Sequence, residues 1–156
     1  MKLYLVRHGE AVPEEDAGSD RDRWLNDRGR EAARVLARLL RENGVEPDAI
    51  VCSPLPRAVQ TAELIASGLD HLASIASLRC LEPSAHPRVA ASAVQQAGMR
   101  VLVVGHEPSI SALGAHVLGR PSFPPFRTAQ CFAIEDNKPT FTARADLAQV
   151  TAYFVD

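Results

Sequence analysis

The chain has 156 residues, of which 46% are hydrophobic and 23% are charged. Globular domains average roughly 45–50% and 25%, so this composition excludes disordered, collagen-like and coiled-coil chains. The length predicts a single domain over residues 1–156 with a self-sufficient core. Seventeen Lys and Arg against nineteen Asp and Glu give a formal net charge of −2. This balance gives no overall electrostatic reason to bind nucleic acid or an anionic membrane.

The cysteines and the N-terminus indicate the compartment. Cys52, Cys80 and Cys131 form no CxxC or Cys/His cluster, which favours free thiols in a reducing environment over zinc sites or a disulfide framework. The apolar stretch before Arg7 is too short for a signal peptide, and no run approaches the ~20 apolar residues of a membrane span. We therefore expect a soluble, cytoplasmic protein.

Strand and helix patterns alternate along most of the chain. A short apolar strand at residues 3–6 runs into a charged loop from Glu10 to Leu25. A helix over 26–43 follows, with Asn26 as its N-cap and Gly44 as its stop. The later strands and helices are predicted at 49–52 (strand), 57–69 (helix), within 75–81 (short strand), 87–97 (helix), 101–104 (strand) and 108–118 (helix).

This alternation predicts a three-layer α/β/α sandwich around a mostly parallel sheet. The last thirty residues differ, because 130–134 and 140–143 read as two strands around a turn containing Asp136, Asn137 and Pro139. We expect this pair to be antiparallel at an edge, which makes the sheet mixed.

Cationic and imidazole side chains follow three of the predicted strands. Arg7 and His8 follow the first, Ser53 and Arg57 the second, and His106 the third. Since ligands of open α/β sheets bind beyond the carboxyl ends of the strands, these residues are expected to converge on one volume.

Two guanidinium groups offer planar pairs of donors that match a phosphate. A histidine is a nucleophile when neutral, and adjacent positive charge favours its neutral form, so His8 is the candidate for attack on phosphorus. Gly9 is expected to allow a tight turn and to expose backbone N–H groups to the anion.

The same residues lie in three blocks: RHGE at 7–10, SPLPRAVQTA at 53–62 and GHEP at 105–108. In order and spacing these blocks resemble the signatures of the histidine phosphatase superfamily, which has the phosphoglycerate mutase-like fold. The resemblance implies that His8 is the phosphorylated nucleophile and that Arg7 and Arg57 clamp the phosphate. It also implies that His106 bonds to the transferring phosphoryl group.

Within the superfamily the chain is most similar to the short phosphohistidine phosphatases of the SixA type. Residues 19–29 resemble their S-x-x-x-R-x-L-T-x-x-G pattern, with Asn26 where Thr is usual. The resemblance makes Arg23 a further phosphate or substrate contact, and the alternative is an exposed loop charge.

Two carboxylates are candidates for the general acid that protonates the leaving group. Glu82 is similar in position to the acid of the mutase and small-molecule phosphatase branch. Glu107, beside His106, takes the place of an Asp in the acid phosphatase branch. Either one can instead be a carboxylate that stabilises a helix N-terminus.

The leading hypothesis is a phosphatase that acts on phosphohistidine of a protein partner. An imidazole leaving group needs little help from an acid, and residues between Arg57 and His106 leave little chain for a lid, so the site is expected to be open with the 10–25 loop as a flap. The alternatives are a phosphatase or mutase for a small phosphate ester, and a non-catalytic phosphate- or phosphoprotein-binding module. We expect no metal and no other cofactor, because the guanidinium groups supply the positive charge.

Overall fold

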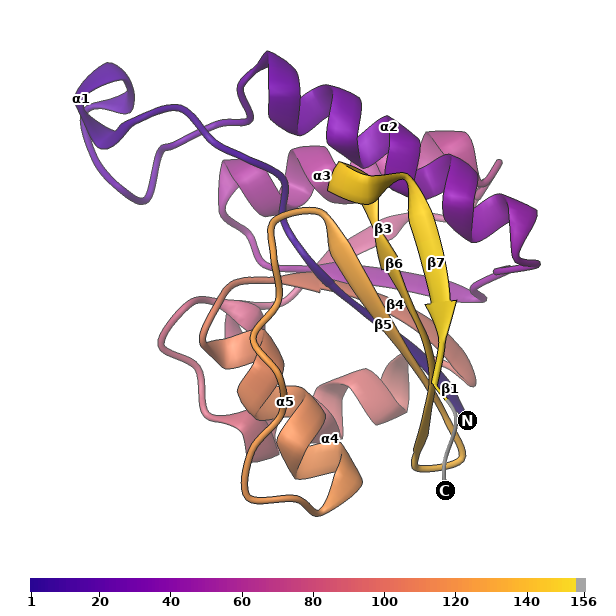
Figure 1. Ribbon diagram of the computed structural model, residues 1–156. Helices are drawn as coiled ribbons and strands as arrows, with labels where there is room; N and C mark the ends of the chain where they lie inside the picture. The colour runs from indigo at the N-terminus through magenta and orange to yellow at the C-terminus, as the bar shows by residue number, and fades with distance from the viewer. Residues whose placement is uncertain (154–156) are drawn as a thin grey trace.

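The computed structural model describes residues 1–153 of the chain, and in this part seven strands form one mixed sheet (Figure 1). The strands are β1 Lys2–Arg7, β2 Ala49–Cys52, β3 Ile75–Ser77, β4 Arg100–Gly105, β5 Gln130–Glu135, β6 Lys138–Arg144 and β7 Gln149–Ala152. The α-helices are α1 Glu14–Ala17, α2 Asp27–Glu42, α3 Pro56–Gly68, α4 Pro87–Ala97 and α5 Ser109–Leu118, and two short 3₁₀ segments are η1 Arg79–Leu81 and η2 Ala145–Leu147.

The strand order is β3-β2-β4-β1-β5-β6-β7. Strands β1 to β4 are parallel to one another, whereas β5, β6 and β7 each pair antiparallel with the preceding strand in this order. Helices α2 and α3 cover one face of the sheet, and α4 and α5 cover the other (Figure 1). The predicted α/β/α sandwich with a mixed sheet is confirmed.

The sheet has a buried core on each face because the inner positions of its central strands carry apolar side chains on both faces. In β1, Leu3 and Leu5 pack with residues of α4 and α5, and the alternating Tyr4 and Val6 pack with residues of α2 and α3. Strand β4 alternates in the same way. This is the period of two that a strand imposes on its side chains.

The helix boundaries follow from capping residues in the sequence. The Asn26 side chain accepts a hydrogen bond from the Gly29 amide (2.8 Å), as a helix N-cap does. Pro87 occupies the first turn of α4, and Gly119 ends α5 in the left-handed conformation with φ 63°. These predicted ends are confirmed to within a residue or two.

The C-terminal strands differ from the prediction. The pair β5 and β6 is antiparallel, but the edge of the sheet is a further strand, β7, which pairs with β6. The turn consists of Asp136 and Asn137, both with positive φ, and Pro139 lies within β6 at an irregularity in its pairing with β5. Proline has no N–H to donate to a strand ladder, and it is tolerated there because the ladder is interrupted at this irregularity.

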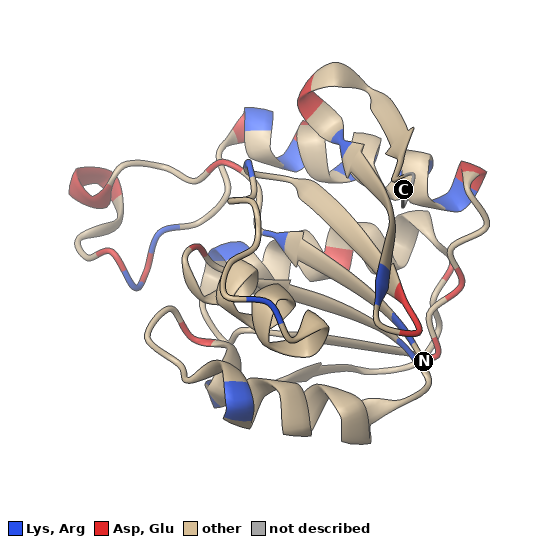
Figure 2. Ribbon diagram, turned by 60° about the horizontal axis from the view of Figure 1, so that its bottom comes forward, with Lys and Arg blue, Asp and Glu red and all other residues tan. Residues whose placement is uncertain are grey.

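The exposed face of α2 carries charges of both signs. Helix α2 carries five arginines and three acidic residues (Figure 2), and three of the arginines pair along the helix: Arg30 with Asp27, Arg34 with Glu31, and Arg38 with Glu42. This helix face is therefore partly neutralised by its own carboxylates. No helix within residues 1–153 has the length and apolarity needed to cross a membrane.

Candidate active site

The two predicted histidines lie side by side because their strands are paired in register. Arg7 at the end of β1 lies opposite Gly105 at the end of β4, so His8 and His106 leave the sheet together. The His8 amide extends this pairing by donating to the Gly105 carbonyl (3.1 Å). The two imidazole centroids are 5.1 Å apart.

His8 presents a nitrogen lone pair to the solvent side of the site. Its Nδ1 lies 2.7 Å from the Gly9 carbonyl oxygen, which can only accept, so Nδ1 carries the proton and Nε2 remains unprotonated. The pKa of His8 is lowered to about 3, chiefly by burial; the Gly9 hydrogen bond opposes this shift, and the nearby His106, Arg57 and Arg7 add to it. The imidazole is therefore neutral at pH 7, the state that a nucleophile requires.

His106 is held through one ring nitrogen only. Its Nε2 lies 2.8 Å from the Ser53 hydroxyl, and its buried Nδ1 has no hydrogen-bond partner among the described residues. Burial, followed by the charge of Arg57, lowers the pKa of His106 to about 4. This imidazole is also neutral at pH 7.

Arg57 is positioned by the start of α3, one residue after the Pro56 that begins the helix. Its side chain is 5% exposed. Its Nη1 donates to the Asp20 carbonyl (2.7 Å), Nη2 lies 3.4 Å from the Asp20 carboxylate, and its buried Nε has no partner among residues 1–153.

Arg7 is a second half-satisfied guanidinium. Its Nη1 donates to the Phe126 carbonyl (2.9 Å), while its buried Nε is unpartnered within the described chain. Burial lowers the pKa of both Arg7 and Arg57. Because desolvation disfavours their positive charges, an anion that enters between these groups would stabilise them.

These groups line a cleft of about 280 Å³. Small-molecule pockets typically measure roughly 300–1,000 Å³, so this cleft lies near the lower end of that range and fits a phosphoryl group together with a small group that carries it. Six predicted site residues are in its wall: Arg7, His8, Arg23, Arg57, His106 and Glu107.

Residues 10–25, called the flap below, form one side of the cleft. The flap is closed at its base by hydrogen bonds from Val12 N to Trp24 O (2.8 Å) and from Asn26 N to Glu10 O (3.1 Å). Its tip, which carries the acidic α1, projects away from the sheet (Figures 1 and 2).

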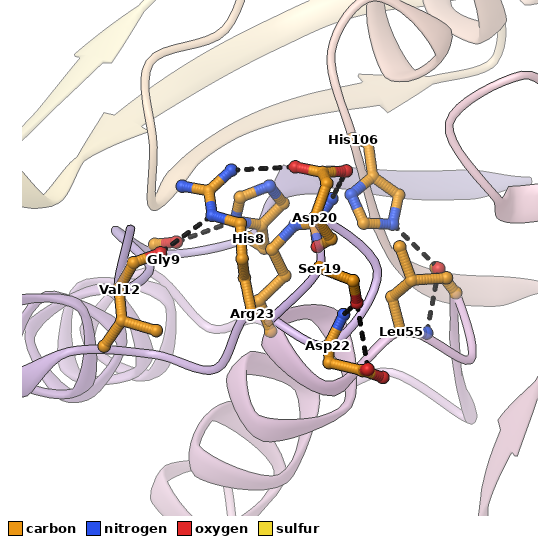
Figure 3. A network of polar contacts seen from close by, with 11 residues as sticks. His8, Gly9, Val12, Ser19, Asp20, Asp22, Arg23, Leu55 and His106 are labelled. Atoms are coloured by element: carbon orange, nitrogen blue, oxygen red, sulfur yellow. Dashed lines mark hydrogen bonds and ion pairs between the residues drawn. The ribbon is translucent and has the colours of Figure 1, made fainter. Parts of the chain in front are cut away.

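Arg23 connects the flap to the cleft. Its Nε donates to the Val12 carbonyl (2.7 Å), and its Nη1 donates to the Asp20 carboxylate (3.1 Å), as Figure 3 shows. These bonds hold Asp20 in the wall of the cleft that His8 and His106 also line (Figure 3). The hydrogen bond from Arg23 holds the pKa of Asp20 below its ordinary value, so the Asp20 side chain is a negative carboxylate at pH 7. This carboxylate contacts Arg57, the arginine that is expected to bind phosphate.

The expectation that Gly9 offers its amide to an anion is corrected by the structure. The Gly9 N–H donates to the Thr61 hydroxyl (3.0 Å), which in turn donates to the Arg57 carbonyl (2.7 Å). The glycine is instead required by packing, because a Cβ at Gly9 would lie 2.7 Å from the Gly29 carbonyl oxygen. This close approach fixes the loop that carries His8 against the start of α2.

The acid candidates occupy different places. Glu82 accepts a hydrogen bond from Arg21 (2.9 Å) that lowers its pKa, and the cleft wall near it is formed by Pro83. Glu107 lines the cleft, but its carboxylate accepts hydrogen bonds from the Ser111 amide (3.0 Å) and hydroxyl (3.1 Å) at the start of α5. Both carboxylates are thus engaged elsewhere.

Three residues of the site were assigned no role from the sequence. Thr61 had a usable signal, because it follows Arg57 by four residues on a predicted helix and so shares its face. Ser53 was placed at a strand end, but its contact with His106 depends on the pairing of β2 with β4. Asp20 had no signal that distinguished it from the neighbouring flap carboxylates.

Comparison with known proteins identifies the family. The model of the histidine phosphatase superfamily (branch 1) matches residues 3–83. The phosphohistidine phosphatase SixA of Escherichia coli (strain K12) is 30% identical over 133 residues, which are 83% of this chain and 81% of that protein.

Solved structures agree with this match. The protein histidine phosphatase SixA complexed with tungstate superposes with a TM-score of 0.79 at 26% identity, covering 99% of this chain and 95% of that one.

Another relative matches in sequence over part of its length. A protein of Picosynechococcus sp. is 40% identical over 67 residues, which are 43% of this chain and 41% of that protein. The chain belongs to the histidine phosphatase superfamily, branch 1, and is a phosphatase of that superfamily.

Proposed function

We propose that this phosphatase removes the phosphoryl group from phosphohistidine on a protein partner, through a covalent intermediate on His8. The observation that carries the proposal is the state of His8. Its neutral imidazole has Nδ1 bonded to the Gly9 carbonyl, and it lies in the cleft wall with the unsatisfied guanidinium groups of Arg7 and Arg57.

The reaction has two steps. The lone pair of His8 Nε2 forms a bond to phosphorus while the P–N bond of the substrate breaks, and the departing imidazole takes a proton from solvent. Water then attacks the phosphorus of phospho-His8, which releases inorganic phosphate and restores the neutral imidazole. Arg7 and Arg57 stabilise the negative charge of the phosphoryl oxygens in both steps.

The surroundings of the acid candidates support a phosphohistidine substrate. An alcohol leaving group needs a proton in the transition state, and a positioned acid contributes roughly 10²–10⁴-fold to such a step. Glu82 is ionised and bonded to Arg21, and the Glu107 carboxylate is bonded to Ser111. Imidazole leaves without such an acid because it accepts a proton near neutral pH.

The cleft has room for a phosphorylated side chain presented by a protein. A phosphorylated side chain needs room for the phosphoryl group and the ring, whereas a metabolite phosphatase usually encloses the whole substrate to exclude water. The names of similar proteins, phosphohistidine phosphatase and protein histidine phosphatase, agree with this substrate. The flap is then the surface that meets the partner.

The test is a comparison of kcat/KM for a phosphohistidine protein, a phosphoserine peptide and a small alkyl phosphate. We expect phosphohistidine to exceed both esters by about 100-fold or more, because only the esters depend on a general acid. Equal or faster turnover of the alkyl phosphate would identify a small-molecule phosphomonoesterase instead. Binding of the phosphoprotein without any turnover would identify a binding module.

A further inference from the structure

The Ser53 hydroxyl makes two hydrogen bonds and is buried away from solvent. It follows β2 and is 0% exposed. Its Oγ accepts a hydrogen bond from the Leu55 amide (3.2 Å) and lies 2.8 Å from Nε2 of His106. Figure 3 shows this chain of contacts running from the His106 ring to Leu55.

The direction of the second bond follows from counting donors and acceptors. A serine hydroxyl has one proton to donate. If Oγ accepted from both the Leu55 amide and an Nε2–H of His106, its own proton would be buried without an acceptor, at a cost of about 1–3 kcal/mol. The arrangement that leaves fewest groups unsatisfied has Ser53 donating its proton to an unprotonated Nε2, so that only Nδ1 of His106 lacks a partner among the described residues.

The other ring nitrogen of His106 is then the protonated one. Nδ1 is buried, has no partner among the described residues, and belongs to a ring that lines the cleft. In Figure 3 it lies on the side of the ring toward His8 and Asp20. A proton there is a donor for an oxygen of a phosphoryl group, whereas a lone pair would repel that oxygen.

We propose that Ser53 is a positioning residue that holds His106 as the Nδ1–H tautomer, so that this imidazole donates a hydrogen bond to the transferring phosphoryl group. The two histidines of the cleft then offer the phosphoryl group opposite hydrogen-bonding character, one an unprotonated nitrogen and the other an N–H. The Gly9 carbonyl leaves His8 with a lone pair for phosphorus, and the Ser53 hydroxyl leaves His106 with an N–H for a phosphoryl oxygen. The proposal rests on the proposed function because it assigns His106 its role in phosphoryl transfer.

The first measurement is on the native protein without substrate. Nitrogen-detected NMR of the His106 ring at pH 7 reports which nitrogen carries the proton, since the ring is neutral there. We expect a protonated Nδ1 and an unprotonated Nε2. A proton on Nε2 overturns the proposal, whether or not the protein hydrolyses phosphohistidine.

The second measurement compares Ser53→Ala with a matched control, Ser109→Ala. Ser109 also contacts His106, but its hydroxyl donates to the backbone carbonyl (2.9 Å) and not to the ring. We expect Ser53→Ala to lose the single tautomer and to lower kcat on phosphohistidine about 10–100-fold, by analogy with the range seen when the outer partner of a metal-ligating histidine is removed, with KM changed less than about 3-fold. Ser109→Ala should keep the native tautomer and kcat within about 3-fold.

Rescue distinguishes positioning from general packing. Ser53→Thr retains the hydroxyl, and we expect it to restore the Nδ1–H signal and most of the lost kcat. A folded Ser53→Ala protein with the native tautomer and native kcat would contradict the proposal. If the native protein hydrolyses no phosphohistidine, the proposed function fails. The NMR measurement needs no substrate, so it still shows whether Ser53 holds His106 as the Nδ1–H tautomer.

Discussion

His8, His106, Arg7 and Arg57 form a largely buried cluster in which each side chain has a different hydrogen-bond partner. The structure satisfies only part of each side chain: one nitrogen of each imidazole, and Nη groups but not Nε of each arginine. Unsatisfied buried donors are rare in folded proteins, and they mark a place where a ligand completes the bonding. At the residue scale the site is therefore built for an anion with several acceptor oxygens.

Substitution of Glu82 tests the acid at the residue scale. We expect Glu82→Gln to change kcat on phosphohistidine by less than about 3-fold, because Arg21 keeps this carboxylate ionised and a departing imidazole does not need its proton. Steady-state kinetics with phosphohistidine and with an alkyl phosphate make the comparison. A loss greater than about 10-fold on phosphohistidine would show that Glu82 is a general acid in spite of its ion pair.

The flap is the element that governs access to Arg57. The Asp20 carbonyl and carboxylate both contact the Arg57 guanidinium, and a negative carboxylate there opposes the binding of phosphate. The flap must therefore give up this contact when an anion enters between Asp20 and Arg57.

Asp20→Ala tests this competition by isothermal titration of inorganic phosphate. We expect the variant to bind phosphate about 5-fold more tightly, equivalent to about 1 kcal/mol, the typical worth of one hydrogen bond. Asp22→Ala is the matched control, because it removes the same charge from the flap but its carboxylate bonds only to Ser19 among the described residues. Weaker phosphate binding by Asp20→Ala than by the control would mean that Asp20 supports the site and does not compete with the ligand.

The elements that could be predicted are those with a strong pattern. The strands at 49–52 and 101–104 and the helices of the two outer layers follow continuous apolar runs, helical spacing and capping residues. Strand β7 could not be predicted, because QVTA at 149–152 is short, largely exposed and without an apolar run. Helix α1 has four residues and none of them is buried, so no periodicity marks it.

The residues that form the site could be predicted from the sequence, but the hydrogen bonds and contacts between them could not. Arg7, His8, Arg57 and His106 all lie at a strand end or within five residues after one, and a parallel sheet brings strand ends together. The Gly9–Gly29 contact, the Asp20–Arg57 contact and the Ser53–His106 bond join segments far apart in the chain, and they depend on register and loop path. Those are tertiary properties that no local pattern contains.

At the scale of the whole molecule, the two neutral histidines couple folding to pH. The pKa of His8 is lowered to about 3 and that of His106 to about 4, whereas an unfolded histidine titrates near ~6.5. Between these values the unfolded chain binds more protons than the folded one, so stability rises with pH in this window and falls on acidification below about 6.5.

Denaturant unfolding in phosphate-free buffer tests this coupling. From pH 6.5 to pH 5, we expect each buried histidine to lower the free energy of unfolding with a slope approaching about 1.4 kcal/mol per pH unit. The double variant His8→Asn/His106→Asn should lose up to twice that slope while its carboxylates remain as in the native protein. An unchanged pH dependence in the double variant would mean that the folded histidines titrate normally.

The most direct test of phosphoryl transfer through His8 is rapid-quench labelling of the native protein with a radiolabelled phosphohistidine substrate. We expect protein-bound phosphate that is stable in alkali and labile in acid, formed before inorganic phosphate is released and absent from His8→Ala. Turnover with no such labelled species, or equal labelling and turnover in His8→Ala, would contradict a covalent intermediate on His8.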